Sequence, residues 1–333
     1  MSGKLGRREF IGRTAAIGAG VAVLGRTGAF AAGAGSKSVV VKVVRDDAVV
    51  DNKPNATVVR EMVHAAVMKL SGKTTPEEAW KQYVKPSDVV AVKINCLFGV
   101  GAATHPEVTT AVVEGIRMAG VPAEKIIVWD RENGHLEKSG YKVGVIDGVT
   151  YTGVNGDWEE EPAEGLTCKG RVARILTQKC TALINVPILK THVLAGMTLA
   201  LKNHYGSFHN PGDAHGPKDP KAVHGGACDP FIAEVNSLKC IREKTRLIVA
   251  DALLPVADRG PQARPESTWA YKAILAATDP VAIDYVGLKI LDEQRAKTGK
   301  EPLESTNSAK CIFTAAAKGL GVADMSKIDL VTA

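Results

Sequence analysis

Residues Asp88-Val89-Val90-Ala91-Val92-Lys93-Ile94-Asn95 form a continuous apolar run that ends in polar side chains. Its length and its β-branched residues predict a strand that is buried on both faces of a sheet. An amphipathic helical pattern follows over Pro106–Ala119, and a second apolar run covers Lys125–Trp129. Strand, helix and strand in this order are typical of a parallel sheet. We therefore expect an α/β fold with a mostly parallel, Rossmann-like sheet and helices on both faces.

The same alternation continues along the rest of the chain. Further strands are expected at Ser38–Val44, Arg171–Leu176, Thr181–Ile188, Arg246–Ala250 and Ala273–Ala277, and further helices at Thr57–Leu70, Pro280–Ala296 and Asn307–Lys318. Thr104 and Glu107, with Pro106 between them, predict a capping box at the start of the first helix named above. Residues 32–333 are expected to form a single domain or two closely packed halves, 32–165 and 166–333.

The first residues carry an export pattern. A paired arginine in Gly6-Arg7-Arg8-Glu9-Phe10-Ile11 precedes a weakly apolar run from Thr14 to Gly25, and Ala29-Phe30-Ala31 has small residues at the cleavage positions. Residues 1–31 are therefore interpreted as a twin-arginine signal peptide that is read by the Tat translocase. The apolar run has 12 positions, fewer than the roughly 20 that a membrane helix needs. We expect a periplasmic or otherwise extracytoplasmic protein with no stable membrane span after cleavage.

The charge and the cysteines exclude several classes of protein. Of the formal net charge of +6, residues 1–31 supply +4, from five basic residues and one acidic residue, so the mature chain carries about +2. Nucleic-acid binding needs a clustered basic face and is not expected. The six cysteines contain no Cys-x-x-Cys pair, which makes an iron–sulfur cluster or a structural zinc site unlikely on spacing. Cys168 and Cys180 are a candidate disulfide, and buried free thiols are the equal alternative.

Polar residues follow several of the expected strands. In a parallel sheet, ligands bind beyond the carboxyl ends of the strands, where such residues converge. We predict three catalytic residues there, namely Lys93, Asp130 and Lys190, and five substrate-binding residues, namely Asn95, Arg131, Thr191, Lys202 and Asn203. Asp251 and Asp279 also follow expected strands, and Asp279 before Pro280 is typical of a helix N-cap.

Three blocks of sequence carry a family resemblance. The stretches Leu189-Lys190-Thr191-His192, Gly196-Met197-Thr198 and Leu201-Lys202-Asn203, between Val90–Asn95 and Thr278–Asp284, resemble the domain of unknown function 362 family. The resemblance implies export, since members commonly bear a twin-arginine signal, but no defined activity. Some members carry an added ferredoxin-like cysteine module, which this chain does not have.

The block from Lys190 to His204 is also faintly similar to the cofactor-bearing segment of lactate racemase. That resemblance implies that Lys190 would anchor a nickel-containing nucleotide and that His204 would ligate the metal.

Histidines are concentrated in one part of the chain. Five of the eight lie within the 33 positions from His192 to His224, and four of these five belong to an irregular segment, Lys202–Asp229, that is rich in Gly, Pro and Asn. So long an irregular segment is usually functional. Imidazoles suit Zn, Fe, Ni and Cu, and we predict a transition-metal site with His192, His204 and His224 as ligands.

Two other kinds of site use the same neighbourhood. Lys93, Arg131, Lys190 and Lys202 could surround a carboxylate or phosphate, together with a helix N-terminus near Gly196–Thr198. Gly99-Val100-Gly101 with Asp130 is a weak dinucleotide-binding pattern, because Thr104 stands at the sixth position.

The sequence thus favours an exported metal- or cofactor-dependent enzyme that acts on an anionic small molecule. A non-catalytic periplasmic protein that binds an anion or a metal is the alternative. A third interpretation is an accessory subunit of an exported redox complex.

Overall fold

The computed structural model describes residues 37–213, 228–306 and 308–333. Within them, eleven strands form one mixed sheet in the order β13-β1-β12-β11-β8-β4-β5-β7-β6, with β9 beside β11 and β10 beside β9. The bounds are β1 Ser38–Val44, β4 Val90–Ile94, β5 Ile126–Asp130, β6 Gly144–Ile146, β7 Val149–Gly153, β8 Ala182–Val186, β9 Ile188–His192, β10 Gly196–Thr198, β11 Thr245–Val256, β12 Ala273–Ala277 and β13 Ile328–Thr332. A separate ribbon pairs β2 (Val49–Val50) with β3 (Lys53–Pro54).

The middle of the sheet is parallel. Strands β5, β4, β8 and β11 pair in parallel, as do β5 with β7 and β1 with β13. Strand β12 runs antiparallel to both β1 and β11, and β6 runs antiparallel to β7. The predicted mostly parallel α/β sheet is therefore confirmed.

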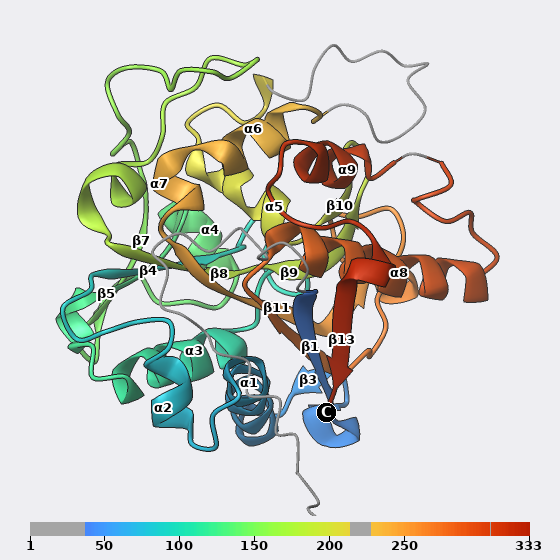
Figure 1. The fold of residues 1–333 in the computed structure, drawn as a ribbon, viewed down its shortest axis with the longest axis horizontal. Helices are drawn as coiled ribbons and strands as arrows, with labels where there is room; N and C mark the ends of the chain where they lie inside the picture. The colour runs from blue at the N-terminus through green and yellow to red at the C-terminus, as the bar shows by residue number, and fades with distance from the viewer. Residues whose placement is uncertain (1–36, 214–227, 307) are drawn as a thin grey trace, which may run out of the picture.

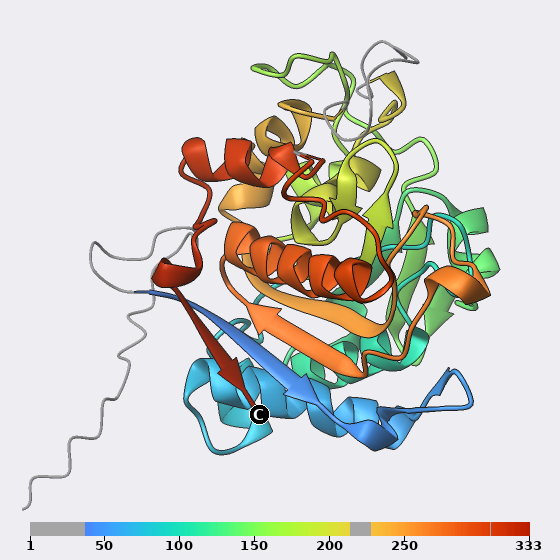
Figure 2. The same ribbon diagram turned by 90° about the vertical axis from the view of Figure 1, so that its right-hand side faces the viewer.

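Helices cover both faces of this sheet (Figures 1 and 2). One face carries α1 (Ala56–Ser71), α2 (Pro76–Trp80) and α3 (Pro106–Met118), and the other carries α5 (Ala200–Asn203), α6 (Phe231–Ser237), α7 (Lys239–Arg242), α8 (Pro280–Lys297) and α9 (Lys310–Ala317). A short helix, α4 (Asn133–Lys138), follows β5. Each face has its own hydrophobic core.

Strand β4 shows how the two cores are divided. Val90, Val92 and Ile94 belong to the core beneath α1 and α3, whereas Ala91 belongs to the core of the opposite face. Side chains alternate between the faces of a strand. Lys93 therefore shares the face of Ala91, the side of the sheet that carries α5 and α8.

Two helix starts follow the local chemistry of their residues. Asn55 precedes α1, and its side chain accepts a hydrogen bond from the Val58 amide. Asp279 precedes α8 and accepts from the amides of Val281 and Ala282, so the predicted N-cap is confirmed. An Asp or Asn at this position satisfies amides that have no partner inside the helix.

The expected strand at Arg171–Leu176 is wrong. Val172 and Ala173 make only isolated bridges, and a π-helical turn begins at Ile175 and ends at Lys179. The expected single strand Thr181–Ile188 is two strands, β8 and β9, which are separated at Pro187. Proline has no amide to donate to a sheet, so its position in the apolar run explains the break.

The expected capping box is also wrong. The N-cap of α3 is His105, which makes no side-chain cap. The Thr104 hydroxyl instead donates to the carbonyl of Val186 and accepts from the Asn95 amide. Long-range contacts to β8 thus replace the local contact that the sequence pattern predicts.

Asp251 does not lie at the end of a strand. Strand β11 continues through it to Val256, and Asp251 is fully buried in the middle of the strand. It contacts His105 rather than the predicted site.

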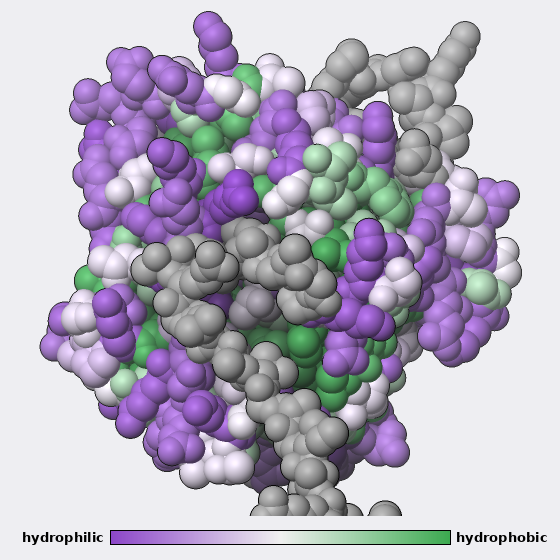
Figure 3. All heavy atoms as spheres, viewed as in Figure 1, coloured by the Kyte–Doolittle hydropathy of each residue, from purple (hydrophilic) through white to green (hydrophobic). Residues whose placement is uncertain are grey.

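The remaining features of the fold are the cysteines, the lengths of the helices and the surface. All six cysteines are free, and Cys168 and Cys180 are not bridged. No helix among the described residues is long and apolar enough to span a membrane. The face in Figure 3 is largely hydrophilic, with hydrophobic residues in a few patches. The predicted signal peptide and residues 214–227, which include His224, lie outside the described residues.

Candidate functional site

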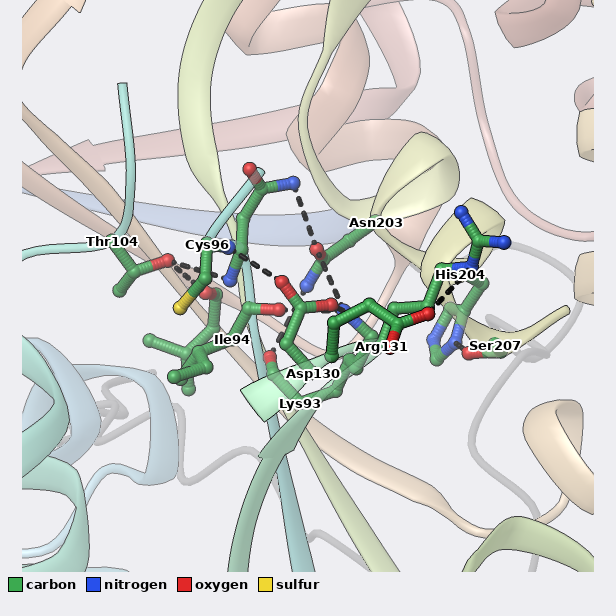
Figure 4. A network of polar contacts seen from close by, with 12 residues as sticks. Lys93, Ile94, Cys96, Thr104, Asp130, Arg131, Asn203, His204 and Ser207 are labelled. Atoms are coloured by element: carbon green, nitrogen blue, oxygen red, sulfur yellow. Dashed lines mark hydrogen bonds and ion pairs between the residues drawn. The ribbon is translucent and has the colours of Figure 1, made fainter. Parts of the chain in front are cut away.

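A buried ion pair stands at the carboxyl ends of two neighbouring strands. In the ladder between β4 and β5, Lys93 pairs with Trp129, so Asp130 follows directly beside it. Lys93 Nζ lies 2.7 Å from Asp130 Oδ1, and the two side chains are 1% and 5% exposed. The other carboxylate oxygen accepts a hydrogen bond from the Cys96 amide at 2.6 Å (Figure 4). Lys93 and Asp130, which were predicted as site residues at two strand ends, therefore lie in contact.

A chain of amides connects this pair to a second lysine. Asn203 Nδ2 donates to the carbonyl of Lys93 and to Asn185 Oδ1, so its Oδ1 faces Asn95 and accepts from Asn95 Nδ2 at 3.1 Å. The Lys93 carbonyl can only accept, and this fixes the direction of every amide in the chain. The oxygen of Asn95 consequently faces Lys190 Nζ at 3.0 Å.

Lys190 is a buried amine with two uncharged hydrogen-bond partners. Its Nζ donates to Asn95 Oδ1 and to the carbonyl of Ala102, and the residue is 2% exposed. Burial lowers the pKa of Lys190 to about 7, and the nearby positive charge of Lys202 acts in the same direction. A lysine with such a pKa is partly neutral near pH 7, and such lysines act as bases or nucleophiles.

Strand β9 divides its predicted site residues between two faces. Lys190 and His192 line a cavity, whereas the Thr191 hydroxyl between them accepts from the Gly260 amide on the other side. This alternation is the two-residue period of a strand. The Thr191 side chain thus holds the loop at Gly260 and does not line this cavity, and its role in binding substrate stays a prediction.

The cavity has a volume of about 140 Å³ and brings together most of the predicted site. Its walls contain the predicted residues Lys93, Asn95, Asp130, Arg131, Lys190, His192, Lys202 and Asn203. They also contain residues that were not predicted, of which Leu97, Phe98, His135, Thr198 and Tyr205 are the largest or most polar. Residues far apart in the sequence thus meet at the predicted edge of the sheet.

Lys202 supplies a second buried cation that faces no carboxylate among the described residues. Its Nζ lies 4.2 Å from the centre of the Tyr205 ring, within the range of a cation–π contact. Burial lowers the pKa of Lys202, while the thiols of Cys228 and Cys311 act weakly in the opposite direction.

Three buried polar atoms on the cavity walls have no hydrogen-bond partner among the described residues. They are Thr198 Oγ1, His135 Nδ1 and Arg131 Nε. The Arg131 guanidinium is held at its other end, where Nη2 donates to the His209 carbonyl at 2.6 Å. Buried polar groups nearly always find a partner, so Thr198 Oγ1 and His135 Nδ1 are available to a polar ligand, whereas Arg131 Nε lies 3.8 Å from Glu132 Oε1.

Two of the three predicted metal ligands, His192 and His204, lie in the part of the chain that the structure describes. His192 Nδ1 accepts from the amides of Leu194 and Ala195, so this nitrogen is occupied. His204 contacts Ser207 through Nδ1, lies outside the cavity wall, and is held neutral because burial lowers its pKa to about 3. No three His, Cys, Asp or Glu side chains of the described ranges gather as a metal site would require. His224 lies outside the described residues, so the predicted set of three ligands stays a prediction.

The expected helix N-terminus near Gly196–Thr198 is not open to an anion. This stretch is strand β10, and the short α5 that follows has its first amides occupied by Asp284. Asp284 is buried rather than solvated, and burial raises its pKa to about 8 although two amides favour its carboxylate. The weak dinucleotide pattern would need Asp130 to bind a ribose. Both oxygens of Asp130 already accept hydrogen bonds within the protein, so this residue is unsuited to that role.

Three side chains of the candidate site were not predicted from the sequence. Thr198 and Asn185 lie in or beside the quoted blocks but carry no pattern of their own, and His135 follows β5 on α4. Of the three, only His135 could have been found from the sequence, because it comes a few residues after a strand end, where loops converge.

Among known proteins, the chain matches one family model and has a distant structural neighbour. A comparison with curated proteins finds no match. Among solved structures, the lactate racemase apoprotein from Thermoanaerobacterium thermosaccharolyticum is similar, with a TM-score of 0.48 and 8% sequence identity over 78% of this chain and 58% of that chain. The chain therefore spans less than two thirds of the length of that structure. The model of the domain of unknown function family DUF362 matches residues 90–289, which is more than half of the chain. This protein is a member of the DUF362 family.

Proposed function

We propose that the cavity binds a small anionic molecule and that the protein is an enzyme in which Lys190 is the reactive group. The charges around the cavity carry this proposal. Lys93 is compensated by Asp130 at 2.7 Å, but Lys202 faces no carboxylate in the part of the chain that the structure describes. A buried cation is costly unless it is paired. A carboxylate or phosphate in the cavity would supply the missing charge.

Thermal unfolding of the full chain tests anion binding. Glycolate or inorganic phosphate should raise the melting temperature relative to the same ionic strength of sodium chloride, because a ligand that binds only the folded state stabilises it. Lys202→Met should reduce the shift. Lys297→Met is the matched control, since Lys297 is 63% exposed in its pair with Glu293. Equal shifts in the parent protein, Lys202→Met and Lys297→Met, or no shift in any of them, would contradict the proposal.

Metal dependence is a separate proposal that rests on His192, His204 and His224 in the sequence. Metal analysis of the purified full chain tests it. A stoichiometric transition metal would support it, and substoichiometric metal with unchanged melting in chelator would contradict it.

Export is proposed from Arg7 and Arg8. Replacing both with lysine should leave the full-length chain in the cytoplasmic fraction, whereas Arg13→Lys should be exported normally. Retention of the processed form outside the cytoplasm in the double variant would contradict twin-arginine transport.

A further inference from the structure

We infer that Lys190 forms a Schiff base with an anionic aldehyde or ketone, and that the Thr198 hydroxyl holds the carbonyl oxygen beside it. This inference rests on the proposed binding of an anion in the cavity, and it specifies the substrate class.

The hydrogen bonds of Lys190 leave its amine oriented for attack. The Ala102 carbonyl and Asn95 Oδ1 accept two of its N–H groups, and the amide chain through Asn203 fixes which atom of Asn95 faces it. A neutral amine has two N–H groups and one lone pair. With both N–H groups held by the wall, the lone pair is left for the cavity that Lys190 lines.

The surroundings of Lys190 favour a nucleophilic amine. The residue is almost fully buried, no carboxylate of the described residues lies within ion-pair distance, and Lys202 lines the same cavity. Desolvation and a second cation are the two conditions that activate a lysine toward carbonyl carbon. A lysine that acts as a general base would need the same neutral amine. A side chain that holds the carbonyl oxygen, however, is needed only when the amine adds to the carbonyl carbon.

Thr198 is placed to be that group. It pairs directly with Lys190 across the antiparallel ladder of β9 and β10, so the two side chains stand on the same face roughly 4.5–5.5 Å apart at Cβ. Thr198 is 3% exposed, lines the cavity, and its Oγ1 has no hydrogen-bond partner among the described residues. A carbonyl oxygen held there would lie next to the lysine amine.

The chemistry balances without a further reactant. The Lys190 nitrogen adds to the carbonyl carbon, and the carbonyl π electrons move to oxygen, which takes a proton to form a carbinolamine. The C–O bond then breaks, water leaves with both protons of the amine, and a C=N bond remains, which is cationic when it takes one proton from solvent. Lys202 supplies the charge that holds the substrate's carboxylate or phosphate.

Reductive trapping of the full chain tests the inference. Glyoxylate is the probe, because it is a small anionic aldehyde, and borohydride reduces the imine to a stable carboxymethyl-lysine. Peptide mapping near neutral pH should find the carboxymethyl group selectively on Lys190, and an excess of glycolate, which cannot form an imine, should suppress it. Lys190→Arg should lose the selective label, and the exposed Lys297→Arg should keep it.

Thr198→Val tests whether trapping of glyoxylate depends on the cavity around Lys190. A lysine on the surface would be trapped at the same rate with or without the Thr198 hydroxyl. The variant should retain stabilisation by glycolate but trap glyoxylate about tenfold more slowly, which is the effect of one lost hydrogen bond. Labelling spread evenly over surface lysines, with Lys190 unlabelled while glycolate still stabilises the protein, would overturn the Schiff base but leave anion binding intact. If glycolate and phosphate also fail to stabilise the protein, the proposed function fails with it.

Discussion

The side-chain oxygen of Asn95 lies 3.0 Å from Nζ of Lys190, so a neutral amide rather than a carboxylate faces this buried amine. The pKa of Lys190 is about 7 because burial opposes its charge and no nearby anion offsets that effect fully.

Asn95→Asp should therefore raise the pKa of Lys190 towards the ordinary lysine range. The new carboxylate would stand at hydrogen-bond distance and favour the ammonium form. An NMR titration of the lysine side chains measures this pKa directly. The exposed substitution Asn52→Asp adds the same charge elsewhere and should leave the titration unchanged. An unaltered Lys190 titration in Asn95→Asp would show that the amide oxygen does not face the amine.

Gly206 lies against the ion pair, and a methyl group should not fit there. A Cβ at this position would lie 2.8 Å from Asp130 Oδ1 and 3.0 Å from Lys93 Nζ. Gly206→Ala should destabilise the protein by about 1–3 kcal/mol through overpacking and should weaken glycolate binding. Urea unfolding and the thermal shift measure the two effects. Gly212→Ala is the matched control, because a Cβ there meets nothing within 4 Å. Equal stability of the two variants would contradict this view of the pair.

The ion pair itself should behave as one buried unit. Asp130→Asn removes the charge opposite Lys93 and leaves the new NH2 group facing one of two donors, the Lys93 ammonium or the Cys96 amide, which should cost roughly 3–5 kcal/mol of unfolding free energy. Adding Lys93→Met should recover part of that loss, because the stranded cation is then gone. A double-mutant cycle by urea unfolding measures the coupling. The exposed pair of Lys297 and Glu293 is the control, with an expected coupling of about 0.5 kcal/mol or less. Additive effects of Lys93→Met and Asp130→Asn would argue against a coupled pair.

The sheet and the meeting of Lys93 with Asp130 could be predicted because both depend on local patterns. An apolar run with alternating faces predicts a strand, and neighbouring parallel strands end at one edge. The same two-residue period could have excluded Thr191 from the cavity wall, since Lys190 and His192 share the face opposite to it. Pro187 likewise marks the break between β8 and β9 in the sequence itself.

The rest of the site depends on contacts that no local pattern contains. Thr198 matters because the hairpin of β9 and β10 places it opposite Lys190, and Asp284 is buried because α8 packs its first turns against α5. The concentration of histidines predicted a metal site. Composition alone does not determine in which direction each histidine side chain points. His204 is directed to Ser207, and a backbone turn occupies one nitrogen of His192.

His105 and Asp251 form a buried pair whose contribution to stability should depend on pH. His105 Nδ1 lies 2.7 Å from Asp251 Oδ2, and Asp251 is fully buried. Burial by itself lowers the pKa of His105, but the charge and hydrogen bond of Asp251 outweigh it, so the net pKa is raised. The protonated histidine therefore stabilises the folded state. This contribution is complete below the ordinary histidine pKa of about 6.5 and is lost as the pH rises through the raised value.

His105→Gln should remove this dependence. The difference in unfolding free energy between the parent protein and the variant should be largest at low pH and should shrink as the pH rises from about 6 to about 9. Urea unfolding at several pH values measures it. His64→Gln provides a control of opposite sign: burial lowers the pKa of His64, whose Nδ1 accepts from Trp80 Nε1, so its contribution is present at high pH and lost as the pH falls below about 6.5. If the His105 difference stays constant or grows with pH, the histidine is not held as a cation by Asp251.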